Sequence, residues 1–117
     1  MKAAKTIIGL TEKVRISGGK GKSKVITARI DTGATISSID SRLATKLCLG
    51  PVVETKVVKS AHGNRKRPVV IAELVIAGKK KKAGFTIADR RHMKYAMLIG
   101  QNILKQGFLI DPSKNRK

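Results

Sequence analysis

Short apolar runs rich in valine and isoleucine alternate with glycine-containing or polar turns along most of the chain. Runs of this length and composition are typical of β-strands. They predict strands at 6–10 and 13–16 (one bent strand or two), 24–30, 52–60, 66–76, 83–88, 97–100 and 108–110. Turns are predicted at 17–22, 61–64 and 78–82, the second of them as the tip of a hairpin. The pattern indicates an all-β fold, a small barrel.

Two segments depart from this pattern and predict short helices. In segment 40–47, Asp40 is suited to cap a helix, Leu43 and Leu47 stand four residues apart, and Gly50 ends the segment. A second helix is expected at 101–105. The basic segment 112–117 is predicted to be a frayed tail. Neither a repeat nor a linker divides the sequence, so residues 1–117 are expected to form one domain.

Composition narrows the class of protein. Apolar residues make up 41% of the 117 residues and aromatic residues only 3%, so the core must be built from Val, Ile, Leu and Ala. The single cysteine, Cys48, excludes an intrachain disulfide and suits a reducing compartment. No apolar run approaches the roughly 20 residues of a membrane span, and the run after Met1 is too short for a signal peptide. A cytoplasmic protein with no membrane partner is expected.

Charge is the second strong feature. The chain has 26 Lys and Arg against seven Asp and Glu, a net charge of +19. Such a field attracts polyanions, so nucleic acid, the ribosome surface and acidic polypeptides are candidate partners. A charge that only maintains solubility is the simplest alternative. A non-catalytic basic barrel that binds nucleic acid or the ribosome is the alternative function, although Phe85, Tyr95 and Phe108 are too few for a base-stacking platform.

The strongest candidate for chemistry follows the predicted strand at 24–30. Asp31-Thr32-Gly33-Ala34 would place a carboxylate on a tight loop whose glycine allows close approach of backbone or substrate. Asp and Gly are also ordinary turn residues, so these letters alone predict no more than a turn. Peptide hydrolysis by a carboxylate pair needs two such groups, and the chain carries this loop once. A catalytic loop would therefore require a second copy of the chain.

Two motifs in the same order resemble those of the retropepsin-like aspartic proteases. IDTGA at 30–34 resembles their active-site strand and loop, and LIGQNIL at 98–104 resembles their C-terminal strand and short helix. The resemblance extends from about residue 24 to 111. More narrowly, ADRRHMKY at 88–95 and LIDPS at 109–113 are similar to a prokaryotic branch often labelled an ATP-dependent zinc protease and found beside RimK-type glutamate ligases.

This resemblance implies a homodimeric closed barrel with one or two short helices and the activity of an aspartic endopeptidase. A water activated between the two Asp31 carboxylates would attack the peptide bond. Thr32 would hydrogen-bond across the dimer interface, and Gly33 would leave room for substrate. The substrate-binding positions it implies are Ala34, Thr35, Ile99 and, at the tip of a hairpin that closes over the substrate, His62, Gly63 and Asn64. A plain surface hairpin is the alternative for that last segment.

The zinc-protease label does not fit the residues. Zinc hydrolysis needs ligands at set spacings, whereas His62, His92 and Cys48 form no such pattern. The nearest approach to a phosphate-binding loop, GKS at 21–23, has Ile16 where that motif requires glycine. Neither a metal nor a cofactor is expected.

Departures from the retroviral pattern refine the expectation. The retroviral enzymes carry an ion pair at positions occupied here by Thr35 and Gln101, so a polar contact is expected in its place. Arg65, Lys66 and Arg67 on the hairpin arm would bring cations onto a substrate. A preference for acidic peptides, such as those that glutamate ligases make, is therefore expected.

Overall fold

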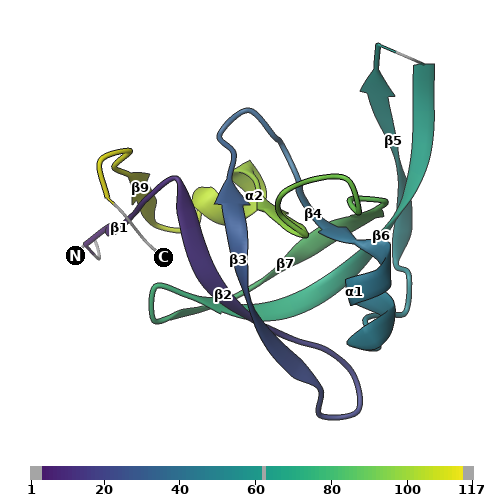
Figure 1. Cartoon of the computed structure of the whole chain (residues 1–117), viewed down its shortest axis with the longest axis horizontal. Helices are drawn as coiled ribbons and strands as arrows, with labels where there is room; N and C mark the ends of the chain where they lie inside the picture. Colours follow the sequence, from purple (N-terminus) through teal and green to yellow (C-terminus); the bar gives the residue numbers. More distant parts are fainter. Residues whose placement is uncertain (1–3, 62, 115–117) are drawn as a thin grey trace.

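The computed structural model describes residues 4–61 and 63–114, in which six strands close into a barrel (Figure 1). Around the barrel, the strands follow the order β2 (Thr11–Ser17), β3 (Ser23–Ile30), β8 (Met97–Ile99), β4 (Ser37–Asp40), β7 (Lys79–Ala88) and β6 (Gly63–Ile76). β6 also pairs with β2, with Val14 opposite Ile76, and this antiparallel pairing closes the ring. The predicted all-β barrel is confirmed.

Period-two alternation of side chains explains how these strands enclose a core. In β2, Val14 and Ile16 are buried while Lys13 and Arg15 face solvent. The interior is almost entirely aliphatic, as the scarcity of aromatic residues requires. Its largest fully buried hydrophobic side chains are Phe85, Ile8, Ile16, Ile39, Leu74, Ile76, Met97, Ile99, Ile103, Val14 and Val70.

Two predictions about strands are corrected. The turn predicted at 78–82 is wrong, because Ala77 (φ 50°) and Gly78 (φ 76°) complete a tight two-residue turn and Lys79 already pairs with Ile76. The four lysines therefore belong to β7, where Lys81 lies with its Nζ 5.5 Å from the centroid of the Phe108 ring. β4 was not predicted, because a strand of sequence SSID lacks an apolar alternation although all four residues are buried.

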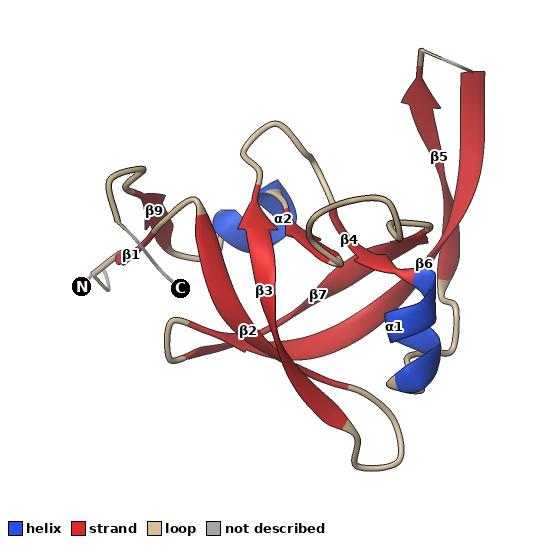
Figure 2. Cartoon of the chain, viewed as in Figure 1, coloured by secondary structure: helices blue, strands red, loops and turns tan. Residues whose placement is uncertain are grey.

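The predicted hairpin is formed by β5 (Glu54–Ser60) and the first half of β6. The two strands pair from Glu54 opposite Val69 to Ser60 opposite Gly63. They extend well beyond the barrel wall (Figures 1 and 2). A long, two-stranded arm of this kind has little core of its own and gains its order from the ladder alone.

The remaining elements lie around the barrel (Figure 2). β1 (Thr6–Ile8) pairs in parallel with β9 (Phe108–Ile110), and helices α1 (Ser41–Lys46) and α2 (Gln101–Leu104) lie where helices were predicted. Asp40 caps α1 by accepting a hydrogen bond from the Arg42 amide, as expected. Among the described residues, no helix is both long enough and apolar enough to span a membrane.

Candidate active site

The Asp31 loop begins where β3 ends. Ile30 pairs with Ile99 of β8, and the Asp31 amide donates a 2.9 Å hydrogen bond to the Ile99 carbonyl. The Gly33 amide then donates a 2.9 Å hydrogen bond to Asp31 Oδ1. One carboxylate oxygen is thus fixed by the loop itself. The half-buried side chain is held at the end of a core strand rather than on a loose turn.

The N-terminus of α2 holds the other side of this loop. The Gln101 amide donates a 2.8 Å hydrogen bond to the Ala34 carbonyl, and Gln101 Nε2 donates one of the same length to the Thr32 carbonyl. The polar contact of the Gln101 side chain is thus with the Thr32 backbone, and not with Thr35, the position expected to take the place of the ion-pair partner. A neutral amide can support the loop in this way without leaving a charge unpaired.

A buried hydrogen-bond cluster fixes the end of the loop to α2. Ser37 donates from its amide and from its Oγ to Asn102 Oδ1, at 2.9 and 2.8 Å. The Gly100 amide donates to Ser37 Oγ at 2.9 Å, and Asn102 Nδ2 donates to the Gly84 carbonyl at 2.8 Å. Neither Ser37 nor Asn102 was predicted to have this role. The only available signal for Asn102 was its place in the Gly-x-Asn motif.

Close packing explains the glycine of that motif. A Cβ at position 100 would lie 2.8 Å from the Ala34 carbonyl oxygen and 2.9 Å from the Ile36 carbonyl carbon. Real Cβ atoms do not approach backbone atoms this closely, so a larger residue would displace the loop that carries Asp31. Gly100 therefore helps to set the position of the carboxylate.

A groove of about 470 Å³ separates the Asp31 loop from the hairpin arm. The loop contributes Gly33, Ala34, Thr35 and Ile36 to it, and the arm contributes Lys56–Lys59 and Arg67. A smaller hollow of about 240 Å³ contains Asp31 itself. Its other lining residues are Arg29, Arg90, Met93, Lys94, Tyr95 and Leu98. Arg90 and Leu98 line both spaces, and among residues 4–61 and 63–114 Asp31 is the sole acidic one that lines either of them.

Only some of the residues implied to bind substrate line the groove. Ala34 and Thr35 line the groove. Gly63 and Asn64 are exposed at the tip of the hairpin and do not line it, because the arms rather than the tip face the loop. Ile99, which the resemblance also implies as a substrate-binding position, is fully buried in the core, and its neighbour Leu98 lines the groove.

His62 and Thr32 complete the residues that the resemblance implies for the site. His62 lies outside the described residues. Thr32 is exposed beside Asp31, and among the described residues no group of three or more His, Cys, Asp or Glu side chains is gathered as a metal site would require.

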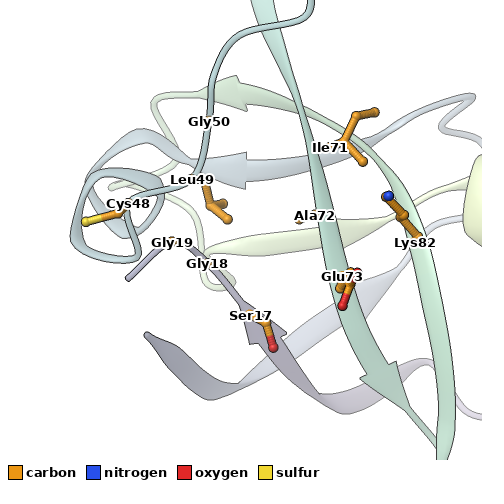
Figure 3. A pocket seen from close by; sticks show the side chains of 10 residues that line it. All are labelled: Ser17, Gly18, Gly19, Cys48, Leu49, Gly50, Ile71, Ala72, Glu73 and Lys82. Atoms are coloured by element: carbon orange, nitrogen blue, oxygen red, sulfur yellow. The ribbon is translucent and has the colours of Figure 1, made fainter. Parts of the chain in front are cut away.

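A third hollow, of about 550 Å³, lies away from the Asp31 loop (Figure 3). It is bounded by the turn after β2, the segment after α1 and the middle of β6. Its charged residues are Glu73 and Lys82, which are direct partners across the β6–β7 ladder. The Cys48 sulfur points away from the other lining side chains (Figure 3).

Asp40 supports the site from behind. Its Oδ1 accepts a 2.7 Å hydrogen bond from the Arg90 amide, and its Oδ2 accepts from the Arg42 amide and Nε at 3.1 and 3.2 Å. Burial raises the pKa of Asp40, but these donors and the Arg42 charge outweigh it and hold the pKa below its usual value of 3.8. Ionised Asp40 thus anchors Arg90 at the edge of the groove.

This lowered pKa predicts a pH-dependent stability. Because the folded-state pKa lies below the unfolded one, ionised Asp40 stabilises the protein above about pH 4, and this contribution is lost as the pH falls through the folded-state pKa. Asp40→Asn should lower the free energy of unfolding near neutral pH, and the difference from wild type should shrink below about pH 4. Urea unfolding at a series of pH values measures this. A difference that stays constant with pH would contradict it.

Comparison with known proteins agrees with a barrel of the retropepsin class. The chain belongs to the RimB-like family, described as the retropepsin-like aspartic endopeptidase RimB, whose model matches residues 42–117. The matched segment contains α2 with Gly84, Gly100 and Asn102 of the buried hydrogen-bond cluster, and it begins after the Asp31 loop and Ser37. The family match therefore does not include Asp31 itself.

Solved structures support the same fold. A Legionella pneumophila protein of unknown function is 19% identical, with a TM-score of 0.66 and coverage of 99% of this chain and 98% of the other. Simian foamy virus protease is 20% identical, with a TM-score of 0.59 and coverage of 81% and 91%. EIAV protease in an inhibitor complex is also 20% identical, with a TM-score of 0.64 and coverage of 82% and 85%. These similarities show the fold alone.

Two curated relatives are named as ligases and not as proteases. Probable α-L-glutamate ligases of Shewanella pealeana and Shewanella halifaxensis are 28% and 27% identical over 115 aligned residues. The alignments cover 77% of this chain but only 25% of each ligase. The chain thus spans about a quarter of the length of these relatives.

Proposed function

We propose that the protein is an aspartic endopeptidase that works as a homodimer, with one Asp31 carboxylate contributed by each subunit. The observation that carries this proposal is the fixed Asp31 loop, which opens on a groove without a second acid among its lining residues. A two-fold axis beside the loop would supply that second carboxylate from an identical surface. The protease fold of the family supports the same assignment.

The proposed mechanism uses two carboxylates that share a proton. Like charges held close together do not both ionise readily, so one Asp31 is ionised and the other protonated, the behaviour for which aspartic proteases are the standard example. The ionised carboxylate takes a proton from water, which attacks the scissile carbonyl carbon. The protonated carboxylate donates a hydrogen bond to the carbonyl oxygen, and the C–N bond then breaks as the amide nitrogen takes a proton from the dyad, which releases the amine and leaves a carboxylic acid. Gly33, which has no side chain, leaves space for the substrate backbone.

The dimer is the first step to test. Exposed apolar residues on β1, β9 and the turn after β1 offer surface that a second copy would cover: Ile7 is 45%, Leu10 53% and Leu109 53% exposed. Sedimentation with and without a peptide substrate analogue measures the association, and a crystal structure of the dimer locates Asp31. An obligate monomer with Asp31 on an isolated surface would overturn the proposal.

The proposed substrates are acidic peptides. The hairpin arm presents Lys56, Lys59 and Arg67 to the groove, whereas Arg65 and Lys66 are exposed and do not line it. Two relatives are named as glutamate ligases. A ligase of that kind forms amide bonds to glutamate, and a peptidase hydrolyses amide bonds, so glutamyl amide bonds are a target that agrees with these relatives. The broader positive surface also allows a ribosome-bound or nucleic-acid-bound substrate.

We expect Arg67→Gln to lower kcat/KM for a Glu-rich peptide several-fold while sparing a matched neutral peptide. Exposed charges are screened over about 8 Å at physiological ionic strength, so the preference for the acidic peptide should also weaken as salt is raised. Lys66→Gln is the matched control, because this neighbour is exposed and outside the groove. Equal rates for both peptides at low salt would end the acidic-substrate proposal and leave the charge to nucleic-acid binding or solubility.

A further inference from the structure

One buried hydroxyl on the floor of the groove has no partner. Ser38 of β4 is 7% exposed, and its Oγ forms no hydrogen bond within the part of the chain that the structure describes. The register places Ser38 beside Thr86 of β7 and Leu98 of β8, and all three line the groove between the Asp31 loop and the hairpin arm. Because its Oγ exposes less than 1 Å² of surface, the Ser38 side chain must turn toward the groove to meet a ligand atom, and the cost of leaving a buried polar group unpaired favours such a partner.

Arg90 stands at the edge of the same floor. Its amide donates to Asp40 Oδ1 at 2.7 Å, and its Nε donates to the Tyr95 carbonyl at 3.0 Å. These two bonds anchor the backbone and the inner edge of the guanidinium. Among the described residues, its terminal nitrogens form no ion pair. Arg90 is therefore a half-buried, pre-oriented cation whose outer edge is free to meet a ligand.

The charges around Arg90 select the sign of that ligand. Burial lowers the pKa of Arg90, and the charges of Arg67 and Arg29 add to this effect, while Asp40 and Asp31 oppose it. Arg67, Lys56 and Lys59 face the groove from the arm. The negative charge of Asp40 is balanced by its ion pair with Arg42, so the cluster of cations around the groove keeps a net positive charge. A small anion with two oxygens suits a guanidinium edge best.

We propose that Ser38 and Arg90 form a carboxylate-binding subsite on the floor of the groove, with Arg67 as a second cation. The subsite would hold one carboxylate of the substrate, close enough to the Asp31 loop to fix which bond is presented to it. The carboxylate belongs either to a Glu or Asp side chain or to a free peptide C-terminus. This inference rests on the proposed function, since it assigns specificity to the same site.

Peptide binding tests the subsite independently of hydrolysis. The probe is a fluorescent (Glu-Gly)₃ peptide, compared with its (Gln-Gly)₃ counterpart, and each is made with a free or an amidated C-terminus. Affinities are measured by anisotropy on the full chain carrying Asp31→Asn, into which Ser38→Ala, Arg90→Gln, Arg90→Lys or the control Arg91→Gln is added. Arg91 is the matched control because it is exposed, pairs with Asp89 and lines neither space.

We expect Ser38→Ala and Arg90→Gln each to weaken binding of the acidic peptide by roughly tenfold, the effect of losing a hydrogen bond to a charged group. The Gln peptide should be little affected. Arg90→Lys should restore part of the loss, since it keeps the charge but not the two-nitrogen edge. Ser38→Ala should leave the melting temperature unchanged or higher, which a purely structural hydroxyl would not do. If the affinity is also lost with the amidated peptides, the subsite binds the carboxylate of a side chain. If it is lost only with the peptides that have a free C-terminus, the subsite binds the terminal carboxylate.

Unchanged Glu-over-Gln discrimination in both Ser38→Ala and Arg90→Gln would overturn the subsite. Cleavage by the protein with Asp31 intact is measured in parallel. If the protein hydrolyses peptides but these variants do not change its preference for the Glu over the Gln peptide, the subsite proposal fails and the peptidase proposal stands. Discrimination that depends on Ser38 and Arg90 without hydrolysis would remove the peptidase and keep a carboxylate-binding groove.

Discussion

Asp31→Asn is expected to reduce peptide hydrolysis by about 10³-fold, within the range that a positioned acid–base group contributes. The amide keeps the size of the carboxyl group and can still accept the 2.9 Å hydrogen bond from the Gly33 amide, so the loop should hold its shape. What is lost is the base that takes a proton from water. Cleavage of a fluorogenic peptide measures the rate, and circular dichroism with thermal melting measures the fold. Asp89→Asn, at an exposed residue paired with Arg91, is the matched control.

Mixing the two forms tests the shared dyad directly. If each active site takes one Asp31 from each subunit, random exchange of equal amounts of wild-type and Asp31→Asn chains should leave about one quarter of the activity of the same total amount of wild type. Independent sites on each chain would leave about one half. Full activity of Asp31→Asn, or wild-type activity lost to a zinc chelator, would indicate metal chemistry in place of the dyad.

Sequence alone predicted the architecture because the chain signals its strands strongly. The β-branched runs, the Asp40 cap and most of the glycine turns agree with the final fold, so the positions of most strands and of both helices follow from local preference, whereas the order of the strands in the sheet does not. The Asp31 loop was predicted from the same consistency between a strand, its end and the Gly-x-Asn segment. Local preference and tertiary structure agree at these positions.

Other features could not be predicted because tertiary contacts override local preference. β4 carries no apolar alternation, and it becomes a strand only because β7 and β8 supply partners on both sides. The lysines at 79–82 suggested a solvated turn, but the left-handed pair Ala77 and Gly78 leaves them in the ladder. The pairing of Ser38 and Arg90 in one groove joins residues 52 positions apart, which no local pattern reveals.

The second large effect, a loss of stability, is expected for the buried hydrogen bonds of Asn102, which fix the end of the Asp31 loop to α2. Asn102→Ala removes the acceptor of the Ser37 amide and Oγ and the donor to the Gly84 carbonyl, and it leaves the fully buried Ser37 without those bonds. Since each unsatisfied buried group costs about 1–3 kcal/mol, the free energy of unfolding should fall by about 2–4 kcal/mol. Urea unfolding measures this loss. Because the cluster also positions the loop through Gly100, the activity of the remaining folded protein should fall as well.

Gln101→Ala separates positioning of the loop from stability of the fold. Its Nε2 hydrogen bond to the Thr32 carbonyl is exposed, so its loss should cost no more than about 1 kcal/mol. The same loss releases one side of the Asp31 loop, so kcat should fall several-fold with KM little changed, because the dyad geometry is disturbed while the groove stays intact. The two neighbours thus give opposite signatures: Asn102→Ala chiefly lowers stability, and Gln101→Ala chiefly lowers kcat. Equal stability losses in the two variants would show that α2 holds the loop only as part of the general core.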